Sequence, residues 1–148
     1  MHLGGKNMSE HSIMQFLDYK VEKLDYKMDK RFNFDSENKV QMEQNLGLEI
    51  QIVSDDEFIV KLEANIHGKD KMVVPFKMVI SILGRFHLEK WQETTEKQNM
   101  VKYNAPAILF PYLRATITNV TAAANISPYV LPLLNLYEVF DFDSEQSE

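Results

Sequence analysis

The chain has 148 residues, a formal net charge of −6 and no cysteine. The length predicts one domain with a core of its own. The missing cysteine excludes disulfides, thiolate metal sites and a cysteine nucleophile. The densest basic cluster, KMDKR at 27–31, contains an aspartate and has no basic partner run, so we expect no nucleic acid partner.

The sequence also predicts neither a membrane span nor a secretory leader. No stretch reaches the roughly 18 apolar residues of a spanning helix, and the start MHLGGKNMSE lacks the apolar centre of a signal peptide. We therefore expect a cytoplasmic protein without membrane insertion. Residues 1–11 are expected to be a flexible N-terminus, residues 12–143 a single domain and residues 144–148 an acidic tail.

Four segments before residue 90 read as strands because apolar residues alternate along them. Residues 12–29 change parity between Val21 and Leu24, which predicts one long strand with a bulge or bend. Residues 46–54 and 58–66 alternate cleanly, and residues 72–89 are the most apolar, with Pro75 at a strand edge or bulge. We interpret these strands as an antiparallel meander.

The polar segment 31–45 predicts a long loop, and loops beyond about 12 residues are uncommon and often functional. Apolar side chains in a polar loop must cover something. The loop carries four of them: Phe32, Phe34, Val40 and Met42.

A long helix is predicted after a short helical or irregular connection over 91–106. Asn104 is placed to cap it, Pro106 lies near its first turn, and Pro111 would end that turn and restart the helix. Between 104 and 125 the one ionic residue is Arg114, and the small residues there favour a helix held between its own sheet and a second copy of the chain. A single helical face is formed by Leu113, Ile117, Val120 and Ala124.

Residues 126–143 are apolar but interrupted by Pro128 and Pro132, so they cannot form one regular helix. We expect an extended segment across the body of the protein. The side chains available to pack are Leu133, Leu134, Leu136, Tyr137 and Phe140.

The chain lacks the residue patterns of a catalytic or metal site. The histidines have no ligand spacing, the glycines are scattered, and neither HExxH nor GxSxG occurs. An enzyme using His87, Glu89 and Tyr103 near a cleft is the alternative of a different class. We interpret the chain as a binding protein without a cofactor, and not as an enzyme.

The stretch ILFPYLRATITNV at 108–120 resembles the Ile-Leu-Phe-Pro-Tyr-x-Arg-x-x-Ile-Thr stretch of the SecB export chaperones, and LPLLNL at 131–136 is similar to their Phe-Pro-x-Leu-Asn-Leu. A bent first strand, a crossover loop, three further strands and a long helix follow in the same order. The resemblance implies an α+β fold, with a four-stranded antiparallel sheet and a long C-terminal-half helix on one face. It also implies assembly as a dimer of dimers, a homotetramer, with the long helices between sheets.

The same resemblance implies an ATP-independent holdase that binds unfolded polypeptide clients in apolar grooves under the crossover loop. Flexible methionines suit a surface that must accept many clients, although Met42 and Met78 taken singly are also explained as core. The net negative charge suits clients that are basic while unfolded. The client-binding candidates are Phe32, Phe34, Val40, Met42, Met78, Ile80, Leu136, Tyr137 and Phe140.

The chain departs from the family where export members dock the translocase motor SecA. Asp25 and Asp29 stand at the acidic positions of the first strand, but Lys77 and Val79 replace an apolar residue and a glutamate on the fourth. About five residues are inserted at 126–130, and the chain stops soon after NLYEVF, where the family has a C-terminal helix. These departures favour an alternative role, as the dedicated chaperone of an antitoxin or another single partner.

Overall fold

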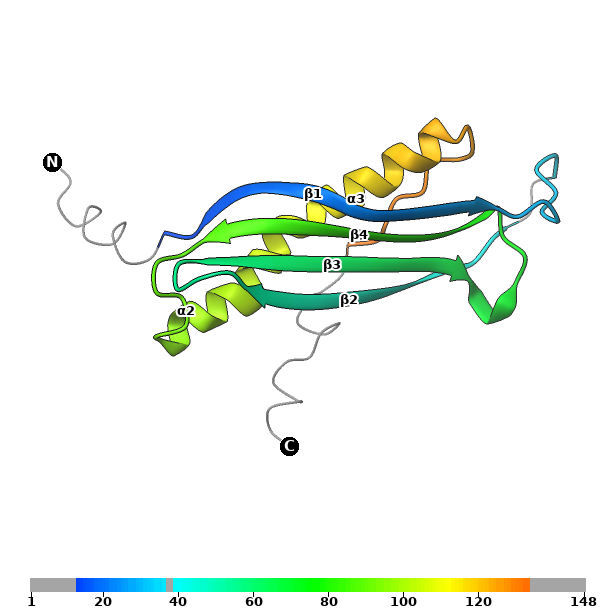
Figure 1. The fold of residues 1–148 in the computed structure, drawn as a ribbon. Helices are drawn as coiled ribbons and strands as arrows, with labels where there is room; N and C mark the ends of the chain where they lie inside the picture. The colour runs from blue at the N-terminus through cyan, green and yellow to red at the C-terminus, as the bar shows by residue number, and fades with distance from the viewer. Residues whose placement is uncertain (1–12, 37–38, 134–148) are drawn as a thin grey trace, which may run out of the picture.

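The computed structural model describes residues 13–36 and 39–133, which form a four-stranded antiparallel sheet with one long helix across one face (Figure 1). The strands are β1 (Gln15–Met28), β2 (Met42–Ile52), β3 (Glu57–Gly68) and β4 (Phe76–His87). The spatial order is β1-β4-β3-β2. The meander prediction is right for the last three strands and wrong for β1, which pairs with β4. The most apolar strand thereby gains a neighbour on both sides, and residues 29–41 must cross from one edge of the sheet to the other.

The change of parity in the first strand has a structural counterpart. Pairing of β1 with β4 shifts register twice, between Phe16 and Asp18 and between Val21 and Lys23. Each shift inserts an extra residue on the β1 side and so turns the side chains that follow to the opposite face. The predicted bent strand is confirmed.

Two strand boundaries differ from the prediction. β2 begins at Met42, within the segment assigned to the loop, because residues 42–45 continue the ladder with β3. β4 begins at Phe76, directly after Pro75, whose ring nitrogen cannot donate to a ladder. Between β3 and β4 lies the 3₁₀ turn η1 (Lys69–Lys71), in which Asp70 and Lys71 have φ of 53° and 60°.

The long helix starts earlier than predicted. Thr94 caps α2 (Thr95–Asn99) by accepting the Lys97 backbone N–H at 3.1 Å. A π-helical turn, η2 (Met100–Asn104), then leads without a break into α3 (Ala105–Ala123). The cap predicted at Asn104 is wrong, since its φ and ψ of −80° and −42° are helical. Pro111 lies inside α3, which continues past it.

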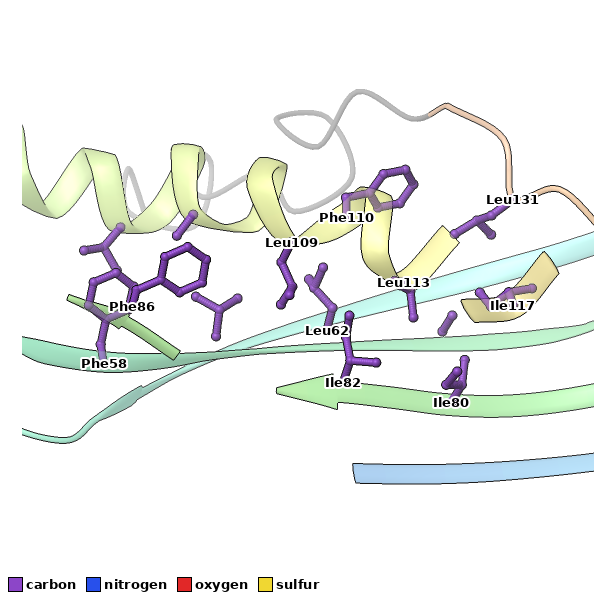
Figure 2. Close-up of a cluster of buried hydrophobic side chains, with 14 of the residues drawn as sticks. Phe58, Leu62, Ile80, Ile82, Phe86, Leu109, Phe110, Leu113, Ile117 and Leu131 are labelled. Carbon is purple, nitrogen blue, oxygen red and sulfur yellow. The ribbon is translucent and has the colours of Figure 1, made fainter. Parts of the chain in front are cut away.

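The core lies between the sheet and α3 (Figure 2). Along β3 and β4 every second residue points to the helix and is buried, from Phe58 to Ile66 and from Phe76 to Phe86. α3 contributes Leu109, Leu113 and Ile117, all fully buried. Burial of such a side chain stabilises the fold by roughly 1.5–3 kcal/mol. The helix lies against β3, β4 and, less extensively, β1.

Candidate functional site: a groove beneath the crossover loop

An open groove of about 700 Å³ lies where the crossover loop passes the end of the sheet. One wall comes from this loop, the floor from the β2 and β4 ends, and the other wall from the turn that follows α3. Among the described residues, the lining contains no charged side chain. It consists of Phe32, Phe34, Ser36, Val40, Met42, Pro75, Phe76, Asn125, Ile126, Ser127, Pro128 and Tyr129.

The loop wall is anchored at its start by Asp29. Its backbone N–H donates to the Pro75 carbonyl at 2.9 Å, and its carboxylate accepts the Arg31 backbone N–H at 3.0 Å and guanidinium at 2.8 Å. The Arg31 guanidinium lowers the pKa of Asp29 to about 2. Beyond this anchor, the rings of Phe32 and Phe34 meet edge to face with centroids 5.0 Å apart.

The opposite wall begins where α3 ends. Asn125 has a φ of 62°, its N–H donates to the Ala122 carbonyl, and the N–H of Ile126 donates to the Thr121 carbonyl. These paired bonds form a Schellman motif, which reverses the chain at a helix C-terminus. Residues 126–133 then run back beside α3; we call them the strap.

Polar side chains of α3 hold the strap to the helix. Thr118 donates to the Tyr129 carbonyl at 2.8 Å, Thr121 accepts the Tyr129 N–H at 2.8 Å, and Arg114 donates to the Leu131 carbonyl at 2.7 Å. Leu131 is fully buried, and the Tyr129 hydroxyl donates to Gln44 on β2. The strap crosses the body of the protein without forming a helix or a strand, as predicted, but Leu133, which was expected to be available for packing, is 78% exposed.

The structure brings four of the predicted client-binding residues to this one groove: Phe32, Phe34, Val40 and Met42. Met78 and Ile80 lie elsewhere, in the core beneath the helix, with 1% and 0% of their surface exposed, so in this chain neither presents a surface to a client. Leu136, Tyr137 and Phe140 lie outside the described residues.

Sequence reasoning missed the groove residues contributed by the β4 end and the strap. Phe76 and Tyr129 contact each other edge to face, with centroids 5.9 Å apart. Tyr129 stands next to Pro128 in the segment noted as an insertion, which signals an irregular, exposed turn carrying an aromatic ring. Phe76 gave no such signal because it continues the alternating apolar series of its strand, like the core residues Met78 and Ile80.

The helix face predicted for assembly faces the chain's own sheet. Leu113 and Ile117 are fully buried in the core, and Val120 and Ala124 are partly buried. A contact with a second copy would therefore have to use the opposite face of α3. On that face Ile108 is 39% exposed, and Ala115, Asn119 and Ala122 are exposed as well. Tyr112 is also 39% exposed, but its ring packs against Phe16 and Tyr19 of β1, with centroids 5.1 Å and 4.9 Å away.

The four residues at the docking positions lie together at one end of β1 and β4. Asp25 stands directly opposite Val79 across the two strands. Asp29 and Lys77 line a separate hollow of about 520 Å³, beside Lys27, Lys30 and Arg31. The β4 residue Lys77, predicted at a motor-docking position, thus contributes a cation to this hollow.

Within the described residues, no group of three or more histidine, aspartate or glutamate side chains is placed to hold a metal ion. In the same part of the chain, no helix combines the length and the apolarity needed to cross a membrane.

Comparison with known proteins assigns the chain to a family. The family described as preprotein translocase subunit SecB matches residues 25–147, which include both walls of the groove. The chain belongs to the SecB family. Membership supports a chaperone role, in a family that is not one of enzymes.

Individual relatives agree with this assignment. An uncharacterized protein of Methanocaldococcus jannaschii is 30% identical over 126 residues, covering 77% of this chain and 79% of that protein. The protein-export protein SecB of Anaplasma phagocytophilum is 30% identical over 84 residues, 55% of this chain and 53% of that protein. The SecB-like chaperone Rv1957 of Mycobacterium tuberculosis, solved with a ChAD peptide from the HigA1 antitoxin, has the same fold. Its TM-score is 0.63 at 12% identity, over 88% of this chain and 93% of that one.

Proposed function

We propose that this SecB-family chain is an ATP-independent holdase whose groove beneath the crossover loop binds apolar segments of unfolded polypeptides. The observation that carries the proposal is the makeup of the groove. Two aromatic rings and a methionine from the loop and β2 face Phe76 and Tyr129, in an open hollow whose described lining residues carry no charge. An exposed apolar surface of this kind marks an interaction site on a water-soluble chain.

The open shape of the groove fits an unfolded client better than a small molecule. A ligand pocket encloses most of its ligand, whereas this hollow is bounded by a loop on one side and a turn on the other. Phe34 is 46% exposed and Val40 is 38% exposed, so a bound peptide would remove apolar surface from water at each position. Binding of unfolded chains then needs no chemical energy source, because mass action alone holds them.

The experiment is suppression of aggregation. The protein, at stoichiometric amounts, is mixed with several unfolding model substrates while light scattering is followed. We expect suppression by the natural chain and a loss of suppression by the double variant Phe32→Ala/Phe34→Ala. The matched control is Ile52→Ala/Val53→Ala, which truncates two apolar side chains that are 65% and 52% exposed at the opposite end of the sheet.

Two results would count against the holdase proposal. If no substrate is protected, the chain is not a general holdase. If the Phe32→Ala/Phe34→Ala variant protects as well as the natural chain while keeping its fold by circular dichroism, the loop wall is not part of the binding site.

A second candidate function is that of a dedicated chaperone for one partner, such as an antitoxin, in place of delivery of clients to SecA. The cation at Lys77, in the hollow beside Asp29, favours it because export members carry an apolar residue or an acid there. Stoichiometric co-purification of a single protein from the native host would support this function. SecA binding that is lost on Asp25→Asn/Asp29→Asn would instead support export.

A further inference from the structure

The groove does not end at the sheet edge but continues into two further hollows. A hollow of about 350 Å³ shares Phe32 and Val40 with the groove, and a third of about 520 Å³ shares Arg31 with the second. Together they form a band that passes from the helix side of the sheet, under the crossover loop, to the outer side. An extended peptide seated in the groove would therefore meet the residues of the outer two hollows next.

The outer hollows are basic, although the whole chain is acidic. The third hollow is lined by Lys27, Lys30, Arg31 and Lys77, with Asp29 as its one carboxylate, and the second adds Lys39. The Asp29 carboxylate forms its ion pair with Arg31, 2.8 Å away, and its electrostatic interaction with Lys77 is weaker. Two further acids, Glu43 and Asp70, line the adjoining surface with Lys71 and Lys77.

Two of these lysines are placed against each other. Lys27 stands directly opposite Lys77 in the β1–β4 ladder, and like charges at directly opposed positions destabilise a sheet. Elsewhere on the same side of the sheet two cations have acidic partners, Lys61 with Glu22 at 3.2 Å and Arg85 with Asp18 at 3.0 Å. Among the described residues, neither Lys27 nor Lys77 has an ion pair within 4 Å. An anionic ligand would relieve their repulsion.

We propose that the preferred client segment is acidic beside its apolar stretch: apolar residues fill the groove, and neighbouring carboxylates bind Lys27, Lys30 and Lys77 around the sheet end. This inference rests on the proposed holdase function and specifies its substrate class. It reverses the preference for basic clients expected from the net charge. Charges more than about 8 Å away are screened at physiological salt, so the nearby lysines outweigh the distant acids.

The test uses three fluorescent peptides with one uncharged apolar core, flanked at both ends by glutamates, serines or lysines. Binding is measured by anisotropy at low salt and at about 0.5 M salt. We expect the glutamate peptide to bind roughly ten-fold more tightly than the serine peptide, the effect of two or three surface ion pairs. The lysine peptide should bind most weakly, and high salt should bring the three affinities together.

Variants assign the effect to the lysines. Lys27→Gln/Lys77→Gln should remove the advantage of the glutamate peptide and leave the affinity for the serine peptide unchanged. Lys20→Gln/Lys23→Gln changes the net charge equally on the same strand, outside the band, and should keep the advantage.

The outcomes separate this inference from the function beneath it. If none of the peptides binds, the proposed groove function is overturned. If all three bind equally, or the lysine peptide binds best, the groove stands and the acidic preference is overturned. An advantage that survives Lys27→Gln/Lys77→Gln overturns the role of these lysines.

Discussion

At Gly84, β4 leaves room for the helix that covers the sheet. A Cβ atom added there would lie 2.8 Å from Cδ1 of Leu109, and both residues are buried. We expect Gly84→Ala to destabilise the fold by about 1–3 kcal/mol, because Leu109 must move within a packed core. Gly47→Ala is the matched control, since a Cβ there meets nothing within 4 Å. Denaturant unfolding measures both, and equal effects would contradict this account of the close approach.

The Asp29–Arg31 pair makes a prediction about pH. The pKa of Asp29 is lowered from 3.8 to about 2, chiefly by its hydrogen bond with the Arg31 guanidinium. Because the folded pKa lies below the unfolded value, the contribution of Asp29 to stability is present above about pH 4 and is lost as the pH falls toward 2. A carboxyl titration by NMR should show this low pKa, and Arg31→Gln should raise it toward 3.8. An unchanged pKa in the variant would contradict the pairing.

Single residues differ in how far the sequence could place them. Phe32 and Phe34 were predictable as groove residues because an aromatic side chain in a polar loop has no core to enter. The sequence could not show whether Met78 and Ile80 are buried or exposed. Alternation reveals the two faces of a strand but does not say which face the helix covers. Tyr129 lines the groove because the chain reverses at Asn125. The position of that reversal depends on where α3 ends, which the local sequence around Tyr129 does not reveal.

At the scale of elements, the strap depends on hydroxyls of α3. Thr121 is fully buried, and its hydroxyl accepts the backbone N–H of Tyr129. Thr121→Val keeps the shape but leaves that N–H without its partner, so we expect a loss of about 1–3 kcal/mol and weaker peptide binding at the groove. Thr116→Val is the control, because its hydroxyl donates to the Tyr112 carbonyl within the same helix. Denaturant unfolding and peptide anisotropy together test the pair, and equal losses in both variants would rule out the strap as the cause.

The order of the strands and the start of the helix show where local patterns stop being informative. Alternation identified all four strands, but the pairing of β1 with β4 joins residues far apart in sequence, which no local pattern encodes. The helix start moved from Asn104 to Thr94 because a polar residue before a helix is a good cap only if the preceding residues are not themselves helical. The family resemblance supplied the crossover that the residue pattern alone did not.

At the scale of the whole molecule, the exposed side of α3 carries the prediction of assembly. Ala115 and Ala122 lie there with Ile108, and small residues allow a second helix to approach closely. We expect sedimentation to give a homotetramer, and Ala115→Glu/Ala122→Glu to give smaller species by placing charge in the contact. The control Gln15→Glu/Gln51→Glu adds the same charge on β1 and β2. A monomer for the natural chain at micromolar concentration would contradict this expectation.

Both walls of the groove come from segments that connect or follow the strands and the helix. The crossover loop enters through the Asp29 anchor, and the opposing turn leaves through the reversal at Asn125, while most of the buried residues that fix the fold belong to the strands and the helix, with Leu131 of the strap added to them. Most of the residues that line the groove are therefore different from those that form the buried core. Selection, natural or in a randomised library confined to 30–36 and 127–128, can therefore change the surface of the groove and leave the packed core as it is.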